Sequence, residues 1–145
     1  MVEKGFVDAL IATIGSCYGA NSVTIRPNDS YTLGIPDVLC WRADGKCLAI
    51  EAKQISPLMP DPFHRGRRTG LMLKHPFMGP QISMLRRLDA VGVEAFGLIR
   101  MSTDVAFRIE PKDIPAKTGN FTYEDLRNYG RPICRRNGLW EIWRD

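Results

Sequence analysis

Two short apolar runs in the first half of the chain, residues 38–41 and 46–50, lie on either side of the polar segment Arg42-Ala-Asp-Gly45. Runs of this length that are rich in valine, isoleucine, leucine and tryptophan and bounded by a glycine-containing turn are typical of β-strands. A three-residue hairpin loop favours glycine in its final, left-handed position, which Gly45 would occupy. The pattern therefore predicts a β-hairpin with the loop at residues 43–45.

This loop predicts the register of the hairpin. Arg42 then pairs with Lys46 and, by counting back, Asp37 faces Glu51. Because side chains alternate along a strand, Glu51 and Lys53 share the face on which Asp37 lies. The residues expected on the opposite, core-facing side are Leu48, Ile50 and Ala52. A loop one residue shorter would place Asp37 opposite Ala52 instead.

The spacing of apolar residues elsewhere predicts an α/β domain. The expected elements are a helix over residues 2–15, a strand over 22–26, a helix over 80–91, strands over 93–100 and 105–109, and a short helix near 122–128. In the first helix, Val7, Leu10 and Ile14 fall on one face together with Glu3. In the second, the residues expected to face the core are Leu85, Leu88 and Val91, and Gln81 stands on the same face.

Composition indicates one domain and leaves the partner open. The 145 residues, with a formal charge of +4 and a pI near 9.0, suffice for a single domain over residues 1–145 with its own core. A modest positive charge suits a polyanionic partner but is also common in proteins that never meet nucleic acid. The positive residues gather in two clusters: Arg65, Arg67, Arg68 and Lys74 between His64 and His75, and Arg127, Arg131, Arg135 and Arg136 near the C-terminus.

The four cysteines and the N-terminus favour a reducing, cytoplasmic setting with free thiols. No Cys-x-x-Cys pair and no histidine at zinc-like spacing occurs, so a structural zinc site is not expected. The N-terminal segment lacks the basic start and the cleavage site of a signal peptide. No apolar run approaches the length that crosses a bilayer, and we expect no membrane association.

Asp37 and Glu51, if they lie side by side, predict a metal site. Two adjacent carboxylates repel each other unless a cation lies between them, and ligation by oxygen alone suits Mg²⁺ or Mn²⁺. The carbonyl of Ala52 is a candidate third ligand. Lys53 is placed to orient or deprotonate a metal-bound water and to hold a phosphate oxygen. The alternative is that Glu51 and Lys53 form an ordinary solvated strand face.

At Pro36-Asp37 and Glu51-Ala52-Lys53 the chain resembles the PD-(D/E)XK nuclease superfamily, and its context resembles the VRR-NUC branch and the archaeal-type Holliday junction resolvases. The resemblance covers roughly residues 1–109, and the remainder, about 110–145, is expected to add a C-terminal helix and a basic, aromatic tail. The context residues are Glu3, Arg26, Ser30 and Gln81.

The resemblance implies a restriction-endonuclease-like core with a mixed, mainly four-stranded sheet flanked by helices. It also implies a Mg²⁺-dependent endodeoxyribonuclease that cuts Holliday junctions or related branched DNA. Symmetric pairs of cuts need two active sites, so we expect a two-fold homodimer. A flap-cutting, nicking or sequence-specific nuclease of the same fold is an alternative, and so is a non-catalytic nucleic-acid-binding module. The last would be indicated by loss of Asp37, Glu51 or Lys53, and all three are present.

Two supporting residues follow from the resemblance, each with a simpler alternative. Glu3 is expected to reach the metal centre from the first helix, or else only to favour the positive end of that helix. Gln81 is expected to fix the water or a phosphate beside the metal, or else to cap its own helix. An amide on a buried face needs hydrogen-bond partners, which favours the role at the site.

Residues 55–79 are predicted to form a long loop that begins directly after Lys53. Loops of this length in a small domain are functional or are solvated insertions, and both interpretations stay open. The candidate DNA-binding residues, in this loop and before the hairpin, are Arg26, Ser30, Arg65, Arg67, Arg68, Lys74 and His75. In the tail, Trp140 and Trp143 among arginines can stack on bases, or can close a core edge or a subunit interface.

Overall fold

A computed structural model describes residues 2–27, 34–55, 58–59, 77–114 and 123–142. The helices are α1 (Val2–Tyr18), α2 (Gly79–Ala90) and the short α3 (Tyr123–Tyr129), with two 3₁₀ turns, η1 (Gly19–Asn21) and η2 (Pro111–Asp113). The strands are β1 (Ser22–Ile25), β2 (Val38–Arg42), β3 (Cys47–Gln54), β4 (Glu94–Arg100), β5 (Val105–Ile109), β6 (Arg131–Arg136) and β7 (Leu139–Trp140). The prediction of an α/β domain is thus confirmed.

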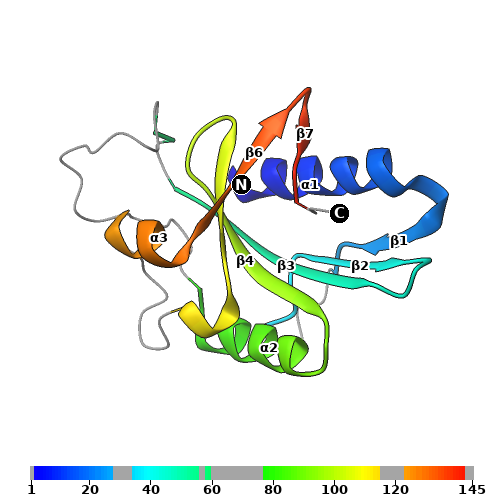
Figure 1. Cartoon of the computed structure of the whole chain (residues 1–145), viewed down its shortest axis with the longest axis horizontal. Coiled ribbons are helices and arrows are strands. Elements are labelled where there is room, and N and C mark those ends of the chain that lie inside the picture. Colours follow the sequence, from blue (N-terminus) through cyan, green and yellow to red (C-terminus); the bar gives the residue numbers. More distant parts are fainter. Residues whose placement is uncertain (1, 28–33, 56–57, 60–76, 115–122, 143–145) are drawn as a thin grey trace.

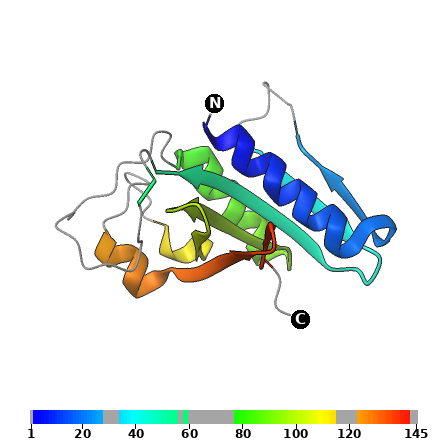
Figure 2. The same cartoon turned by 90° about the horizontal axis from the view of Figure 1, so that it is seen from above.

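The seven strands form one mixed sheet in the order of the sequence, β1 to β7 (Figure 1). Strands β3 and β4 are parallel, and every other neighbouring pair is antiparallel. The sheet is strongly curled, into a half-barrel, and α1 lies in its concave side in contact with β1, β3 and β7 (Figure 2). Helix α2 covers the other face over β3 and β4.

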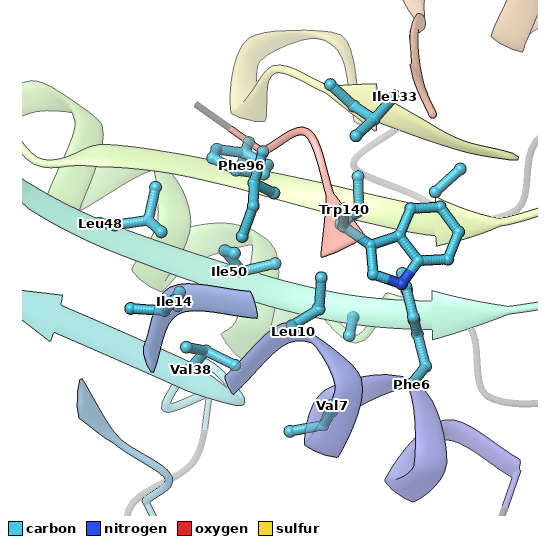
Figure 3. Packing of buried hydrophobic residues seen from close by; sticks show 14 of the residues in the cluster. Phe6, Val7, Leu10, Ile14, Val38, Leu48, Ile50, Phe96, Ile133 and Trp140 are labelled. Atoms are coloured by element: carbon cyan, nitrogen blue, oxygen red, sulfur yellow. The ribbon is translucent and has the colours of Figure 1, made fainter. Parts of the chain in front are cut away.

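The core between α1 and the sheet follows from the predicted apolar stripe. Val7, Leu10 and Ile14 are buried there, and the helix extends past its predicted end at residue 15 to Tyr18. Phe6 meets Trp140 of β7 edge to face, with ring centroids 5.3 Å apart (Figure 3). Such aromatic pairs add to the stabilisation that comes from burial alone, so α1 and β7 hold each other in place.

A second core lies under α2, and here one prediction is wrong. Leu85 is buried and Leu88 packs against the same cluster, but Val91 is 78 % exposed because the helix ends at Ala90 and the chain turns there. Ile82, one turn before Leu85, takes the core position instead.

The expectation of a mainly four-stranded sheet is also wrong. The tail after α3 forms the hairpin β6–β7, whose residues Ile133 and Trp140 enter the core of α1. The turn between these strands is Asn137-Gly138, both with positive φ (54° and 78°). Asn-Gly is a strong sequence signal for a two-residue hairpin turn, although no strands were predicted in this tail. For Trp140, the interpretation as a closing residue of the core is confirmed.

No helix in the described part of the chain is long and apolar enough to cross a membrane. The cysteines are free, as expected.

Candidate active site

The hairpin β2–β3 has the predicted loop and register. The Arg42 amide donates to the Lys46 carbonyl (2.9 Å), the Gly45 amide donates to the Arg42 carbonyl (3.0 Å), and Gly45 has φ +86°. Val38 then pairs with Ile50, so the preceding residue, Asp37, lies opposite Glu51.

Asp37 is held against β3 by the backbone. Its Oδ2 accepts a hydrogen bond of 2.9 Å from the amide of Ala52. Ala52 itself points into the core on the α1 side, so the strand offers Asp37 only its main chain. The carboxylate is therefore fixed beside Glu51 by the strand backbone. Whether the Ala52 carbonyl ligates a metal stays a prediction.

Glu51 and Lys53 are deeply buried on the face that α2 covers, with only 2 % and 4 % of their surfaces exposed. Lys53 Nζ lies 3.5 Å from Glu51 Oε1. Leu48, Ile50 and Ala52 fill the core on the opposite face, as predicted. The interpretation of Glu51 and Lys53 as a solvated strand face is therefore wrong.

Gln81, in the first turn of α2, joins the helix to this pair of charges. Its Oε1 accepts a hydrogen bond of 2.9 Å from the Met78 amide, and its Nε2 donates one of 2.9 Å to Glu51 Oε1. The capping role is thus confirmed, and because the oxygen of the side chain accepts from the Met78 amide, the NH₂ group is turned toward Glu51. That Gln81 fixes a water or a phosphate beside a metal stays a prediction.

Phe77 and Gly97 pack beside Glu51 and Lys53, and neither was predicted as part of the site. Gly97 is the neighbour of Glu51 across the parallel β3–β4 pair. A Cβ atom at Gly97 would lie 2.6 Å from Cζ of Phe77, so the ring occupies the space that glycine leaves. Lys53 Nζ lies 5.5 Å from the centre of the same ring, within range of a cation–π interaction. A glycine inside an apolar strand was the available signal, since it often marks a close approach.

Gly34 connects the Gly-Ile-Pro-Asp segment to α2. Its φ is +85°, and a Cβ atom there would lie 2.3 Å from the carbonyl oxygen of Pro80. Only glycine has both the conformational freedom and the small size for this position. The segment that ends in Asp37 is therefore packed directly on the helix turn that contains Gln81.

The pKa of Glu51 is raised to about 8, chiefly because burial disfavours the charged form. The neighbouring Asp37 contributes to this rise through its charge and through a hydrogen bond with the protonated form of Glu51, whereas Lys53 opposes it. At neutral pH without a cation, Glu51 is therefore mostly protonated. A divalent ion at the pair would displace that proton and remove the repulsion between the carboxylates.

The donor atoms at the site fit a hard divalent cation. When Glu51 is ionised, its buried Oε2 has no hydrogen-bond donor among the described residues, although such atoms are normally paired. Within the described ranges there is no group of three His, Cys, Asp or Glu side chains that could hold a metal. The side chains described here thus supply two carboxylates, and main-chain, water or substrate oxygens would fill the other positions.

The remaining candidates either have their partners elsewhere or lie outside the described part of the structure. Glu3 belongs to α1, which lies on the other face of the sheet, and its side chain is outside the described part of the structure. Arg26 is exposed and forms an ion pair with Asp8 of α1. The other candidates lie outside the described residues: Ser30, Arg65, Arg67, Arg68, Lys74, His75 and, in the tail, Trp143. Their predicted roles stay predictions.

Comparison of the chain with models of known protein families and with curated proteins finds no match.

Proposed function

We propose that the protein is a divalent-metal-dependent nuclease that hydrolyses phosphodiester bonds in DNA. The observation that supports this best is the meeting of Asp37, Lys53 and Gln81 around Glu51, whose Oε2 is buried and has no hydrogen-bond partner among the described residues. A buried acid beside a second, half-buried one destabilises a fold unless the pair binds something, so an arrangement of this kind indicates a functional site.

We propose further that residues 2–100 form a restriction-endonuclease-like core. In support, α1 is followed by an antiparallel arrangement of β1, β2 and β3, then by α2 and the parallel strand β4. The site lies where Asp37, the second half of β3 and the start of α2 converge. The C-terminal β5–β7 extend this core along the sheet.

Each side chain has a distinct part in the chemistry. Asp37 and Glu51 would hold Mg²⁺ or Mn²⁺, which when bound lowers the pKa of a water and neutralises charge on the phosphate. Lys53 donates to a phosphate oxygen or orients the attacking water from its position over the Phe77 ring. Gln81 fixes the orientation of the Glu51 carboxylate.

The preferred substrate in this proposal is branched DNA, with a two-fold homodimer making paired cuts. Flap, nicked or sequence-specific sites remain the alternative substrates of the same chemistry. One experiment separates them: incubation of the protein with four-way junction, flap and linear duplex DNA, with Mg²⁺ or with chelator. Cleavage that requires Mg²⁺ supports the function, and the cleaved DNA identifies the substrate class. A protein that binds these DNAs but cuts none of them with Mg²⁺ or Mn²⁺ is a binding module.

The mechanism predicts that Lys53→Ala and Asp37→Asn each lower the cleavage rate by about 100-fold or more, because each removes a group that acts on charge in the transition state. Matched controls lie on the same hairpin: Lys46→Ala and Asp44→Asn remove equivalent groups from the exposed turn. Rates are measured under single-turnover conditions. Near wild-type cleavage by either site variant would overturn the mechanism.

A further inference from the structure

Two arginines lie side by side on the α1 face of the sheet, at the carboxyl ends of β3 and β4. Arg100 ends β4 and pairs with Gln54, the last residue of β3. Arg135, on β6, donates its backbone amide to the Asp104 carbonyl (2.7 Å) beside Arg100. The guanidinium of Arg135 is near enough to lower the pKa of Arg100, together with the larger effect of burial.

No acidic side chain pairs with these two guanidinium groups within the described residues. Among the residues that the structure describes, Arg100 donates to the carbonyls of Ser102 (3.2 Å) and Thr103 (3.0 Å). The Nε of Arg135 is buried and has no partner in the same part of the chain. Asp104 exerts a weaker, opposing effect on the pKa of Arg100.

Other arginines of the same sheet differ in this respect. Arg108 is paired with Glu94 (2.6 Å) and Glu110 (2.8 Å). Arg136, the next residue after Arg135, is paired with Glu141 (2.7 Å). Two adjacent, partly buried positive charges without an acid are unfavourable unless they bind an anion.

Two further buried polar atoms around this pair have no hydrogen-bond partner in the described segments. One is Nε1 of Trp140, the cross-strand partner of Arg135, whose ring lies 5.8 Å from the guanidinium carbon of Arg100. Gln54, which is 6 % exposed, has an unpartnered Oε1. Buried polar atoms are rarely left unpaired, so their concentration here indicates the place of a ligand or of water that bridges to one.

We propose that Arg100 and Arg135 bind a phosphate group of a nucleic-acid backbone, at a subsite separate from Asp37, Glu51 and Lys53. The guanidinium fork matches phosphate oxygens, and an anion between the two arginines removes their repulsion. The identification of the phosphate as part of DNA rests on the proposed function.

The position of the subsite relative to the carboxylates suits one strand of DNA. Arg100 lies three residues beyond Gly97, the neighbour of Glu51, on the same strand. That separation corresponds to roughly 10 Å along β4. Glu51 and Lys53 lie on one face of the sheet, whereas Arg100 and Arg135 lie on the α1 face. One strand of DNA would therefore pass over the carboxyl ends of β3 and β4 to reach both sites.

The test compares Arg135→Gln with Arg136→Gln, two adjacent substitutions that remove the same charge. Binding of a labelled four-way junction and of a linear duplex is measured in chelator, over a series of salt concentrations. For Arg135→Gln we expect affinity to fall roughly tenfold or more at low salt, because a charge-assisted hydrogen bond is lost. The slope of log K against log salt should become shallower by about 0.9. Arg136→Gln, whose charge is already paired, should change both quantities much less.

A second measurement does not depend on folding of a variant. Phenylglyoxal, which modifies arginine, is applied to the wild-type protein with and without DNA, and modified residues are mapped by mass spectrometry. We expect DNA to protect Arg135 and Arg100 and to leave Arg136 reactive. Equal effects of the two substitutions, or no difference in protection between Arg135 and Arg136, would overturn the subsite.

Failure of the subsite and failure of the proposed function give different results. Mg²⁺-dependent cleavage with unchanged DNA binding in Arg135→Gln overturns the subsite alone. Arg135-dependent DNA binding without cleavage in any divalent metal overturns the nuclease and supports the subsite.

Discussion

Glu51 is the residue at which the interactions of the site meet. Its Oε1 faces Gln81 and Lys53, while its Oε2 has no partner among the described residues. Gln81 donates from a fixed direction because its oxygen is already bonded to the Met78 amide. One oxygen is thus held by the protein and the other is left to a ligand. Asp37, directly before β2, is the only acid among the described residues that affects the pKa of Glu51.

Without a divalent metal, the protein should lose stability as pH rises from about 5 to 8. The pKa of Glu51 is about 8 in the folded state, above its ordinary value of 4.5, so the folded state binds a proton that the unfolded state has released. The folded state is favoured by that proton at low pH, and the advantage is lost as pH increases through this window. We expect Glu51→Gln to flatten the dependence, as measured by urea unfolding in chelator at several pH values.

Metal binding should show the opposite trend. Because the ion competes with the proton on Glu51, Mg²⁺ affinity is expected to increase with pH up to about 8, with release of up to one proton per ion below that pH. Calorimetry in buffers of different ionisation enthalpy measures the released proton. A pH-independent affinity would contradict this account of Glu51, and Glu141→Gln, on the surface, is the matched control.

At the scale of elements, the site depends on how the segment before β2 packs against α2. The hairpin alone sets the register of Asp37 and Glu51, but Gln81 reaches Glu51 only if the first turn of α2 is correctly placed. Gly34 makes that placement possible through its close approach to Pro80. Gly97, which has no side chain, likewise leaves the space that the Phe77 ring occupies beneath Lys53.

Gly34 and Gly45 offer a matched test of this contact. Both have the same unusual backbone angle, φ +85° and +86°, but a Cβ atom at Gly45 meets nothing within 4 Å. Gly45→Ala should therefore destabilise the fold by about 1–2 kcal/mol, from backbone strain alone. Gly34→Ala should destabilise it by roughly 1–3 kcal/mol more and lower the cleavage rate, because Pro80 and Gln81 must move. Urea unfolding and single-turnover cleavage measure the two effects, and equal stabilities of the two variants would contradict the steric argument.

At the scale of the molecule, the two helices cover the sheet unequally. Helix α1 fills the concave side, whereas α2 packs on β3 and β4. This leaves three apolar side chains of the β1–β2 hairpin uncovered: Val23 (60 % exposed), Ile25 (45 %) and Trp41 (44 %). Val23 and Trp41 are cross-strand partners and lie on the face to which Glu51 points, and β1 is the first strand of the sheet order. An exposed apolar patch of this kind is typical of an association surface.

If the protein is the homodimer that paired cuts require, this patch is where we expect the subunits to meet. Val23→Asp should then shift the protein toward monomer by at least tenfold in dissociation constant, because a charge in the interface would be desolvated. Val91→Asp is the control, since Val91 is 78 % exposed just after the end of α2 and is not part of β1 or β2. Sedimentation velocity measures the dissociation constant. A monomeric wild type, or an equal response of the two variants, would exclude this interface.

The amino-acid sequence by itself determined the features that depend on residues near one another in the chain. The glycine at the end of a three-residue loop set the register of Asp37 and Glu51, strand alternation set the side to which Glu51 and Lys53 point, and the apolar spacing placed α1 and α2. The hairpin β6–β7 belongs to this class as well, since Asn137-Gly138 was a readable signal.

Only the tertiary structure decided what depends on residues far apart in the chain. The curl of the sheet brings Trp140 to Phe6, the crossover brings Phe77 under Lys53, and the packing of α2 brings Gln81 to Glu51. The elevated pKa of Glu51 arises from the same packing, because burial is a property of the whole fold. Local spacing can place a carboxylate on a strand face, but the surroundings that determine its charge come from distant segments that close over it.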